Sequence, residues 1–477
     1  MPRYLDTLLT VQLTRLCTIP SVFLQTMMAT CLYVSKCTLL QIHLGRQVCS
    51  RFLVASKLLH GNQLHTHSLN CHRISTSARV RWWCSAVCAV TPRSGLLCLV
   101  GQYRHGVFLL PTRTLVSGLQ LPPLPSTEEL MKKHGCLRRV FKSRIKNKYI
   151  LDPALAAVVV DHLGDLSENK RWIFELNPGP GVMTRELLAA GASRILIVEN
   201  DRVFLPYSMA LAKHVGERLH VKYADFFRID PLGDGVVKQP AISSVELFNK
   251  VQPAHWKEEA VVRVVGMLSQ EKEKTHLRHM CYRVLERSSL FEYGRMELNL
   301  FITEKVYNMI TAPPGVDLVV YESTSILCQA CFDIQLLLKE PNSRFLPVQV
   351  KGKTSYKHKA NADRFVNDHM CLVRLTPKAT LFDQGLTPQN GSQFIFLVRQ
   401  LMAKPRAKLT DRMEIWVPGS LNILSDLGLR PDMRAGDLSP TQFMKLFLLL
   451  LKSGSFHNTW WEEEAYEQIH SINNRAA

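Results

Sequence analysis

One segment of the chain combines glycines with an apolar run in a way that suits the binding of a nucleoside-containing cofactor. Residues 174–184, with the sequence FELNPGPGVMT, lead from an apolar stretch through Gly179 and Gly181 into a stretch of helical pattern. Glycines let the backbone approach a ligand closely, and the start of the following helix offers free N–H groups. A lone G-x-G is weak evidence by itself, because an ordinary structural turn has the same pattern.

Two carboxylates further along the chain strengthen this interpretation. Glu199 ends the next apolar stretch, and Asp225 ends the one after it. A carboxylate at the first position can accept hydrogen bonds from both ribose hydroxyls, and one at the second can accept a hydrogen bond from the exocyclic amine of an adenine. The third glycine of the pattern G-x-G-x-x-G is missing after Gly181, which favours S-adenosylmethionine over NAD.

A doubly wound parallel sheet is the arrangement that brings these residues together. Between residues 150 and 270, short apolar stretches alternate with stretches of helical pattern. Strands are predicted at 172–176, 194–199, 219–224 and 260–265, and helices at 153–160 and 182–190. Because parallel strands end at the same edge of a sheet, the three motifs are predicted to line one crevice.

The remainder of the chain after residue 270 has a mainly helical pattern. A further strand is predicted at 318–321, an exposed basic loop within 339–368 and an apolar helix at 439–452. The long connection at 231–257 indicates a segment that lies on the surface or is ordered by a partner.

The cysteines favour a structural role over a metal site. Cys328 and Cys331 form a single C-x-x-C without a second pair at zinc spacing, so we predict core thiols and no metal.

The charge balance points to a polyanionic partner. The 477 residues include 59 Lys and Arg against 40 Asp and Glu, a formal net charge of +19. Such a surplus favours nucleic-acid binding, because Lys and Arg release counterions from phosphates. The alternative is a basic surface combined with a basic targeting segment. The chain has no run of 18 apolar residues, so no membrane span is predicted.

Residues 1–125 differ in composition from the rest. Asp6 is the only acidic residue before Glu128, in a stretch rich in Arg and Ser, which is typical of a mitochondrial transit peptide. We predict a basic, acid-poor leader without ordered structure; the alternative is a leader without function. Residues 126–149 form a basic arm after a proline-rich linker. Four cations of the arm are predicted to contact nucleic acid, the alternative being a solvated helix face: Lys142, Arg144, Lys146 and Lys148.

Four motifs together resemble the rRNA adenine dimethyltransferase family. They are KYILDP at 148–153, ELNPGPG at 175–181, VEND at 198–201 and ADFF at 224–227. Members of that family bind S-adenosylmethionine and convert adenine N6 of small-subunit rRNA to dimethyladenine. A smaller branch serves mitochondria as transcription factors B. VVGM at 264–267 and LTP at 386–388 are similar to the second paralogue of that branch, and the resemblance spans residues 140–470.

The resemblance implies a fold and a set of cofactor contacts. The implied fold is a Rossmann-like, seven-stranded S-adenosylmethionine-dependent methyltransferase domain at 150–335, followed by a smaller, mainly helical C-terminal domain at 336–477 with a basic loop and an acidic tail. Asn177 stands where the family usually has a first glycine. The implied contacts to S-adenosyl-L-methionine come from Ile150, Asn177, Gly179, Gly181, Glu199 and Asp225.

The end of the fourth predicted strand departs from the family pattern. Active members carry Asn-Leu-Pro-Tyr there, and this chain carries Met267-Leu268-Ser269-Gln270. In the family, the Asn aligns the target amine and the Tyr stacks on the flipped base. Met267 cannot accept the amine's hydrogen bonds as an amide oxygen does, and Gln270 is no aromatic platform. We therefore assign no catalytic residue and expect weak or absent methyl transfer.

Two functions follow from these observations. The first is a transcription initiation factor of the mitochondrial matrix nucleoid, with promoter DNA, mitochondrial RNA polymerase and the mitochondrial high-mobility-group transcription factor as partners. The alternative is a mitochondrial small-subunit rRNA adenine-N6,N6-dimethyltransferase of weak or residual activity. Glu199 and Asp225 favour the enzyme, and Met267 to Gln270 favour the initiation factor. A Rossmann protein with an unrelated substrate is a third possibility.

Overall fold

The chain divides into two units, residues 1–114 and 115–477. The computed structural model describes residues 87–90, 97–103, 106–109, 121–138, 147–166, 171–231, 239–348, 367–417, 421–430 and 432–454. In the first unit, three antiparallel strands follow one another: β1 (Val87–Val90), β2 (Leu97–Tyr103) and β3 (Gly106–Leu109). The expected lack of order does not hold over these strands. The rest of the leader, with the predicted transit peptide, lies outside the described residues.

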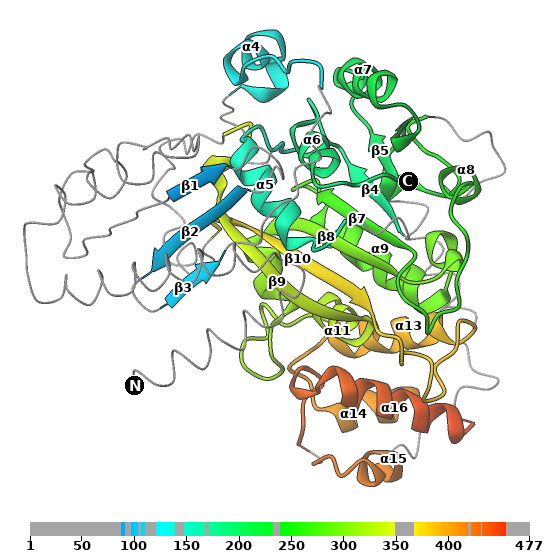
Figure 1. The fold of residues 1–477 in the computed structure, drawn as a ribbon. Coiled ribbons are helices and arrows are strands. Elements are labelled where there is room, and N and C mark those ends of the chain that lie inside the picture. Colours follow the sequence, from blue (N-terminus) through cyan, green and yellow to red (C-terminus); the bar gives the residue numbers. More distant parts are fainter. Residues whose placement is uncertain are drawn as a thin grey trace, which may run out of the picture. The chain divides into compact units, whose positions relative to one another are not determined.

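The second unit is built on a seven-stranded sheet (Figure 1). Its strands are β4 (Trp172–Leu176), β5 (Ile195–Glu199), β6 (Leu219–Tyr223), β7 (Val262–Met267), β8 (Met296–Thr303), β9 (Phe332–Pro341) and β10 (His369–Pro377). They lie in the order β6-β5-β4-β7-β8-β10-β9. The first five are parallel, and β10 runs antiparallel between β8 and β9. The strand order reverses between β4 and β7, the place where open α/β sheets form ligand crevices.

The sequence-based strands and helices of the Rossmann part are confirmed to within two residues. The strand expected at 318–321 is wrong, because this segment folds into a turn around Asp317. The backbone N–H of Val319 donates to the Asp317 side chain at 2.9 Å, and that of Tyr321 donates to the Asp317 carbonyl at 2.8 Å. These bonds use backbone groups that a sheet partner would otherwise need.

The predicted domain boundary at residue 335 is also wrong. It falls inside β9, which pairs with β10 along its length, so both strands beyond the boundary complete the sheet. The start of the expected basic loop at 339–341 therefore belongs to a strand, and residues 349–366 of that loop lie outside the described part of the chain.

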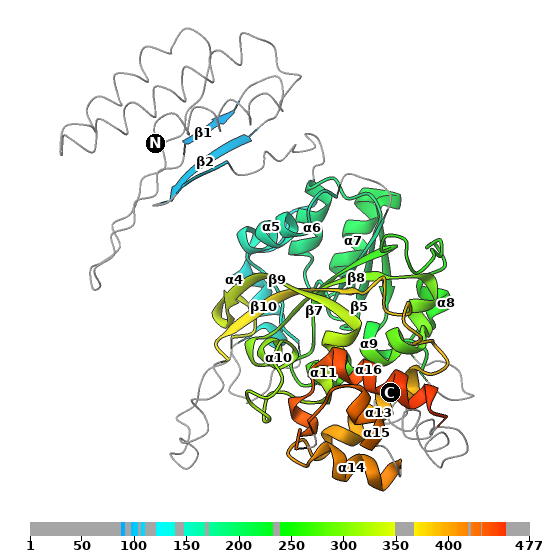
Figure 2. The same ribbon diagram turned by 90° about the horizontal axis from the view of Figure 1, so that it is seen from below.

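Helices cover both faces of the sheet (Figures 1 and 2). On one face α5 (Pro153–His162), α6 (Val182–Ala189) and α7 (Leu205–Val215) bury apolar side chains such as Leu155, Leu187 and Leu211. The larger core on the other face includes α8 (Ser244–Leu247), α9 (Glu273–Glu286), α10 (Glu304–Ile310) and α11 (Ser323–Cys331). The C-terminal helices α13 (Gly391–Met402), α14 (Leu409–Trp416), α15 (Leu421–Asp426) and α16 (Pro440–Lys452) follow, and α13 and α16 pack on α11.

The connection between β6 and β7 packs on the protein's own core. Ile242, Leu247 and Trp256 are buried there, so the expectation of a surface or partner-ordered segment is wrong for the described residues 239–257. The apolar side chains of this segment supply the reason, since their burial stabilises the packed state.

Three cysteines lie together in the core. Cys328 and Cys331 are buried on α11, and the Sγ of Cys328 lies 3.5 Å from that of Cys281. The described residues hold no group of three or more His, Cys, Asp or Glu side chains fit to bind a metal. None of the helices in the described ranges is long and apolar enough to cross a membrane.

The N-terminal arm begins with the short helix α4 (Thr127–Lys133). Ser126 caps it: the Ser126 hydroxyl accepts the backbone N–H of Glu129, and the Glu129 carboxylate accepts the backbone N–H of Ser126. Leu130 of α4 packs with Tyr149 and with Phe204, which precedes α7. The arm is thereby fixed over the start of α7.

Candidate cofactor site

The turn after β4 has the backbone conformation that the glycine motif predicted. Asn177, Gly179 and Gly181 have φ angles of 49°, 63° and 85°, all in the left-handed region. Gly179 also has a close neighbour, because a Cβ added there would lie 2.5 Å from Cδ1 of Tyr149. The turn therefore requires glycine at 179 for two independent reasons.

Glu199 ties the end of β5 to this turn. One carboxylate oxygen accepts the backbone N–H of Gly179 at 3.0 Å, and the other accepts that of Asp201 at 2.8 Å. Burial raises the pKa of Glu199 to about 7, although these backbone donors favour the ionised form. The side-chain oxygen of Asn177 accepts the backbone N–H of Asn200 at 3.3 Å. The structure thus brings together Asn177, Gly179 and Glu199, as predicted from the sequence.

Asp225 lies at the end of the neighbouring strand β6. It is half-buried, and its side chain accepts the backbone N–H of Phe227 at 3.0 Å. Phe226 is buried in the core, whereas the ring of Phe227 lies 4.2 Å, centroid to centroid, from the imidazole of His276 on α9. The carboxylate of Asp225 therefore stands at the carboxyl edge of the sheet beside an aromatic pair.

The arm residue at the glycine turn is Tyr149, whereas the sequence interpretation named Ile150. The side chain of Ile150 is buried in the apolar cluster under α5 and α6. Successive side chains of an extended segment point in opposite directions, so Tyr149 faces the turn when Ile150 faces the core. The expected contact between Ile150 and the cofactor stays a prediction. The backbone of Tyr149 pairs with that of Leu346, with N···O distances of 2.6 and 3.0 Å.

Lys148 does not occupy the surface position expected of a phosphate ligand. It is buried, and its ammonium group donates to the carbonyl of Asn342 at 3.2 Å. Burial lowers the pKa of Lys148 to about 8, and the charge of Glu273 opposes that shift. The predicted nucleic-acid contact is therefore corrected for Lys148. Lys142, Arg144 and Lys146 lie outside the described residues.

The end of β7 has lost the polar character of the family motif. Met267 is 8% exposed, pairs with Phe301 of the neighbouring strand β8, and belongs to the buried apolar cluster that also includes Met370. The side-chain amide of Gln270 donates to the Sδ of the same Met370 at 3.5 Å. A thioether is only a weak acceptor, so Met267 does not offer, at the end of β7, the amide oxygen that would align an amine.

Glu175 is a buried carboxylate that sequence reasoning did not single out. It lies on β4, and neither of its oxygens has a hydrogen-bond partner among the described residues. Burial raises its pKa to about 8, partly offset by the Thr184 hydroxyl, while the Glu199 charge adds to the increase. The available signal was an acidic residue within the otherwise apolar segment 172–176.

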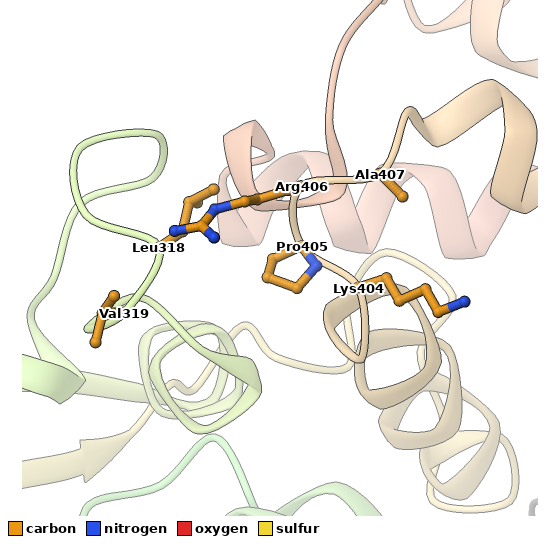
Figure 3. A pocket seen from close by; sticks show the side chains of 6 residues that line it. All are labelled: Leu318, Val319, Lys404, Pro405, Arg406 and Ala407. Carbon is orange, nitrogen blue, oxygen red and sulfur yellow. The ribbon is translucent and has the colours of Figure 1, made fainter.

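The residue types at this edge fit S-adenosylmethionine. The turn at 177–181 presents backbone in the left-handed conformation, and carboxylates stand at the ends of β5 and β6. A separate open hollow of about 480 Å³ lies elsewhere, lined by Leu318, Val319 and residues 404–407 (Figure 3). None of the predicted cofactor ligands lines that hollow, so it is not the candidate cofactor site.

The fold defines the class of protein. The strand order, with the antiparallel strand β10 inserted between β8 and the edge strand β9, is that of Rossmann-like S-adenosylmethionine-dependent methyltransferases. Residues 138–452 match the family model described as ribosomal RNA adenine dimethylase. The chain belongs to this family.

Relatives place the chain more narrowly within the family. It is 36% identical over 334 residues to dimethyladenosine transferase 2, mitochondrial, of Bos taurus, which covers 69% of this chain and 83% of the relative. The protein of that name from Homo sapiens is 30% identical over 383 residues, covering 78% and 95%. Mitochondrial dimethyladenosine transferase 1 of Bos taurus is only 26% identical, over 239 residues that cover 50% of this chain and 63% of that protein. The resemblance to the second paralogue is confirmed.

Solved structures include a dimethyladenosine transferase from Plasmodium falciparum. It aligns with a TM-score of 0.44 at 15% identity, covering 64% of this chain and 98% of that structure.

Proposed function

We propose that this protein is a mitochondrial transcription initiation factor that binds separated strands of promoter DNA and assists mitochondrial RNA polymerase in promoter melting. The observation that carries the proposal is the apolar end of β7, where Met267 is buried in the apolar cluster that includes Phe301 and Met370. A site without the aligning amide and the stacking ring loses interactions worth on the order of 10²-fold in rate each. Weak or absent methyl transfer leaves nucleic-acid binding as the supported activity.

Charge and family support the same proposal. The formal net charge of +19 favours a polyanionic partner, and this family's fold handles single nucleotides taken out of a duplex. Several relatives are named mitochondrial, which supports a mitochondrial location, and the proposed place within the mitochondrion is the matrix nucleoid. The proposed partners are promoter DNA, mitochondrial RNA polymerase and the mitochondrial high-mobility-group transcription factor.

The cofactor site supports a second candidate function, an S-adenosylmethionine-dependent rRNA adenine-N6,N6-dimethyltransferase of residual activity. When bound, S-adenosylmethionine supplies an electrophilic methyl group. Glu199 would accept hydrogen bonds from the ribose hydroxyls, and Asp225 would accept one from the adenine amine. The specific observation in favour is the pair of backbone hydrogen bonds that hold Glu199 at the glycine turn. If transfer is absent, this binding site is vestigial.

Run-off transcription from a duplex mitochondrial promoter tests the first proposal. Reactions contain mitochondrial RNA polymerase and the high-mobility-group factor, with and without residues 115–477, and a parallel set uses a pre-melted template. A Glu199→Ala, Asp225→Ala variant separates melting from cofactor binding.

The expected result is that duplex initiation needs this protein, the pre-melted template does not, and the double variant still works. If duplex initiation proceeds equally well without the protein, the initiation-factor proposal fails. Transfer of a labelled methyl group to an rRNA hairpin then decides on the second candidate.

A further inference from the structure

A second cleft lies at the amino end of the parallel strands, away from Glu199 and Asp225. It has a volume of about 230 Å³ and lies between the starts of β4 and β6 and the segment that follows α8. Trp172 is the first residue of β4 and His220 the second of β6, whereas Glu199 is the last residue of β5. Strands of five residues separate the two edges by about 16 Å. The cleft is therefore distinct from the cofactor site.

The walls of the cleft suit a flat aromatic ligand. The rings of Trp172 and His220 lie 5.7 Å apart, centroid to centroid, at an interplanar angle of 38°. Phe174, Leu196 and Leu247 are buried beneath them and form an apolar floor. An apolar and aromatic interior combined with polar side chains at the rim is common in ligand sites.

The rim of the cleft is cationic. The Nζ of Lys250 lies 3.1 Å from the Nε2 of His220. Since an ammonium group only donates, the imidazole accepts there and is neutral. Burial lowers the pKa of His220, and the neighbouring Lys250 charge lowers it further. Lys222 on the same rim forms an ion pair with Glu246, with 2.8 Å between its Nζ and the carboxylate Oε1. Lys250 has no carboxylate partner among the described residues.

We propose that this cleft binds a nucleotide unit, with the base stacked on Trp172 and a phosphate on Lys250. Stacking of a base on an aromatic side chain contributes about 1–3 kcal/mol and tolerates any base. The exposed amide of Asn249 at the mouth offers both a donor and an acceptor to a base edge. The β6–β7 connection, which is long for a link between two strands, builds the wall that carries Asn249 and Lys250.

The cleft adds a site among the described residues to the nucleic-acid binding proposed for this protein. β6 lies at the edge of the sheet. Bound single-stranded nucleic acid can therefore pass around β6, from the amino ends of the parallel β-strands to their carboxyl ends. The inference rests on the proposed function only in taking nucleic acid as the partner. It requires neither methyl transfer nor a bound cofactor.

The test measures binding of a fluorescein-labelled oligothymidylate, a single-stranded DNA, to residues 115–477 by anisotropy across a salt series. Lys250→Ala is compared with Lys213→Ala, a matched exposed lysine on α7 outside the cleft. In a plot of the logarithm of the association constant against the logarithm of the salt concentration, loss of one phosphate contact reduces the steepness of the slope by about 1. We expect that change for Lys250→Ala and no change for Lys213→Ala.

Photocrosslinking locates the base. An oligonucleotide carrying 5-iodouracil is irradiated with the protein, and the crosslinked peptide is identified by mass spectrometry. The expected crosslink is to Trp172 or His220, and Trp172→Phe, which keeps a ring, is expected to retain binding. Competition with free uridine monophosphate distinguishes a free nucleotide from a nucleic-acid strand as the ligand. If the monophosphate displaces the oligonucleotide, the cleft is a pocket for free nucleotides. If the oligonucleotide stays bound and the crosslink is unchanged, the cleft binds a nucleic-acid strand.

Three outcomes overturn the inference. In the first, the protein binds the oligonucleotide while Lys250→Ala keeps the wild-type slope and the crosslinks map elsewhere; the proposed function then survives and the cleft does not. In the second, polyglutamate displaces the oligonucleotide as effectively as a nucleic-acid competitor does, so the cleft recognises any polyanion and not a nucleotide. In the third, the wild type binds no oligonucleotide, and the proposed function fails with the inference.

Discussion

The two halves of the sheet's carboxyl edge differ in what they retain. On the half formed by β4, β5 and β6, the glycine turn, Glu199 and Asp225 are the residue types that a nucleoside cofactor needs, and backbone hydrogen bonds fix Glu199. On the other half, the end of β7 presents Met267 and Gln270 in an apolar setting. Residues on different strands bind the cofactor and align the target amine. Alignment of the amine can therefore be lost while cofactor binding is kept.

Packing explains why the altered half is stable. Met267 is buried in an apolar cluster with Phe301 and Met370, where a thioether side chain needs no hydrogen-bond partner and a buried amide would need one. On the retained half, Glu199 remains buried, and it satisfies the backbone N–H groups of Gly179 and Asp201. Glu199 therefore has a structural role that can preserve it even if the cofactor is no longer used.

The largest expected effect comes from restoring the family motif on the altered half. The triple variant Met267→Asn, Ser269→Pro, Gln270→Tyr returns the aligning amide and the stacking ring. We expect methyl transfer to an rRNA hairpin to rise by about 10²-fold or more, because a single well-placed electrostatic contact is worth that much. Incorporation of a labelled methyl group measures the rate.

A variant with Glu199→Gln added to the triple change is the control, and it is expected to lose most of the gain. If the wild type already transfers methyl groups as fast as the triple variant does, the end of β7 is competent for catalysis and the two halves do not differ in function.

The next effect is on cofactor affinity and lies in the retained half. Hydrogen bonds to a charged group contribute about 1.5–3 kcal/mol, so Glu199→Ala is expected to weaken S-adenosylmethionine binding by about 10- to 100-fold. Isothermal titration calorimetry measures the dissociation constant, and thermal unfolding checks that the variant is folded. The triple β7 variant is expected to bind the cofactor as the wild type does; a matching loss in both variants would show that the halves act as one site.

A smaller effect concerns Glu175 and the pH dependence of stability. Its folded-state pKa of about 8 lies above the ordinary value of 4.5, because burial disfavours the charge. The folded state thus holds this proton more tightly than the unfolded state does, and Glu175 reduces stability progressively as pH rises from 4.5 to 8. Glu175→Gln removes this titration, so we expect it to stabilise the protein by about 1–3 kcal/mol more at the top of this range than at the bottom.

Urea unfolding at the two ends of that pH range measures the difference. An equal effect of Glu175→Gln at both pH values would mean that the carboxylate keeps its ordinary pKa in the folded protein.

The sequence predicted the parts of the fold that local pattern determines. The β4 strand and its glycine turn were found because an apolar run, two glycines and a helix start follow one another within 174–184. The positions of Glu199 and Asp225 at one edge followed from the parallel order alone. Both are properties of a short segment or of a general rule of topology.

The misplaced elements depend on contacts between distant segments. β9 was interpreted in part as a loop because its half-exposed, partly basic sequence becomes a strand only by pairing with β10, which begins 28 residues after β9 ends. Lys148 was expected at the surface because its burial depends on the carbonyl of Asn342, almost 200 residues away. Ile150 was named instead of Tyr149 because which of two neighbours faces the turn depends on the bridge to Leu346.

The smallest expected effect concerns the packing of the N-terminal arm on the glycine turn after β4. Tyr149 packs its ring against Gly179 and Phe204, and its hydroxyl lies near polar side chains that include Asn147 and Glu199. Tyr149→Phe keeps the ring and removes only the hydroxyl, so we expect a loss of about 0.5–1.5 kcal/mol in the free energy of unfolding. Tyr149→Ala, which also removes the ring, is expected to cost more by urea unfolding. If the two variants are equally destabilised, the hydroxyl and its polar partners hold the arm, and the packing of the ring on the glycine turn contributes little.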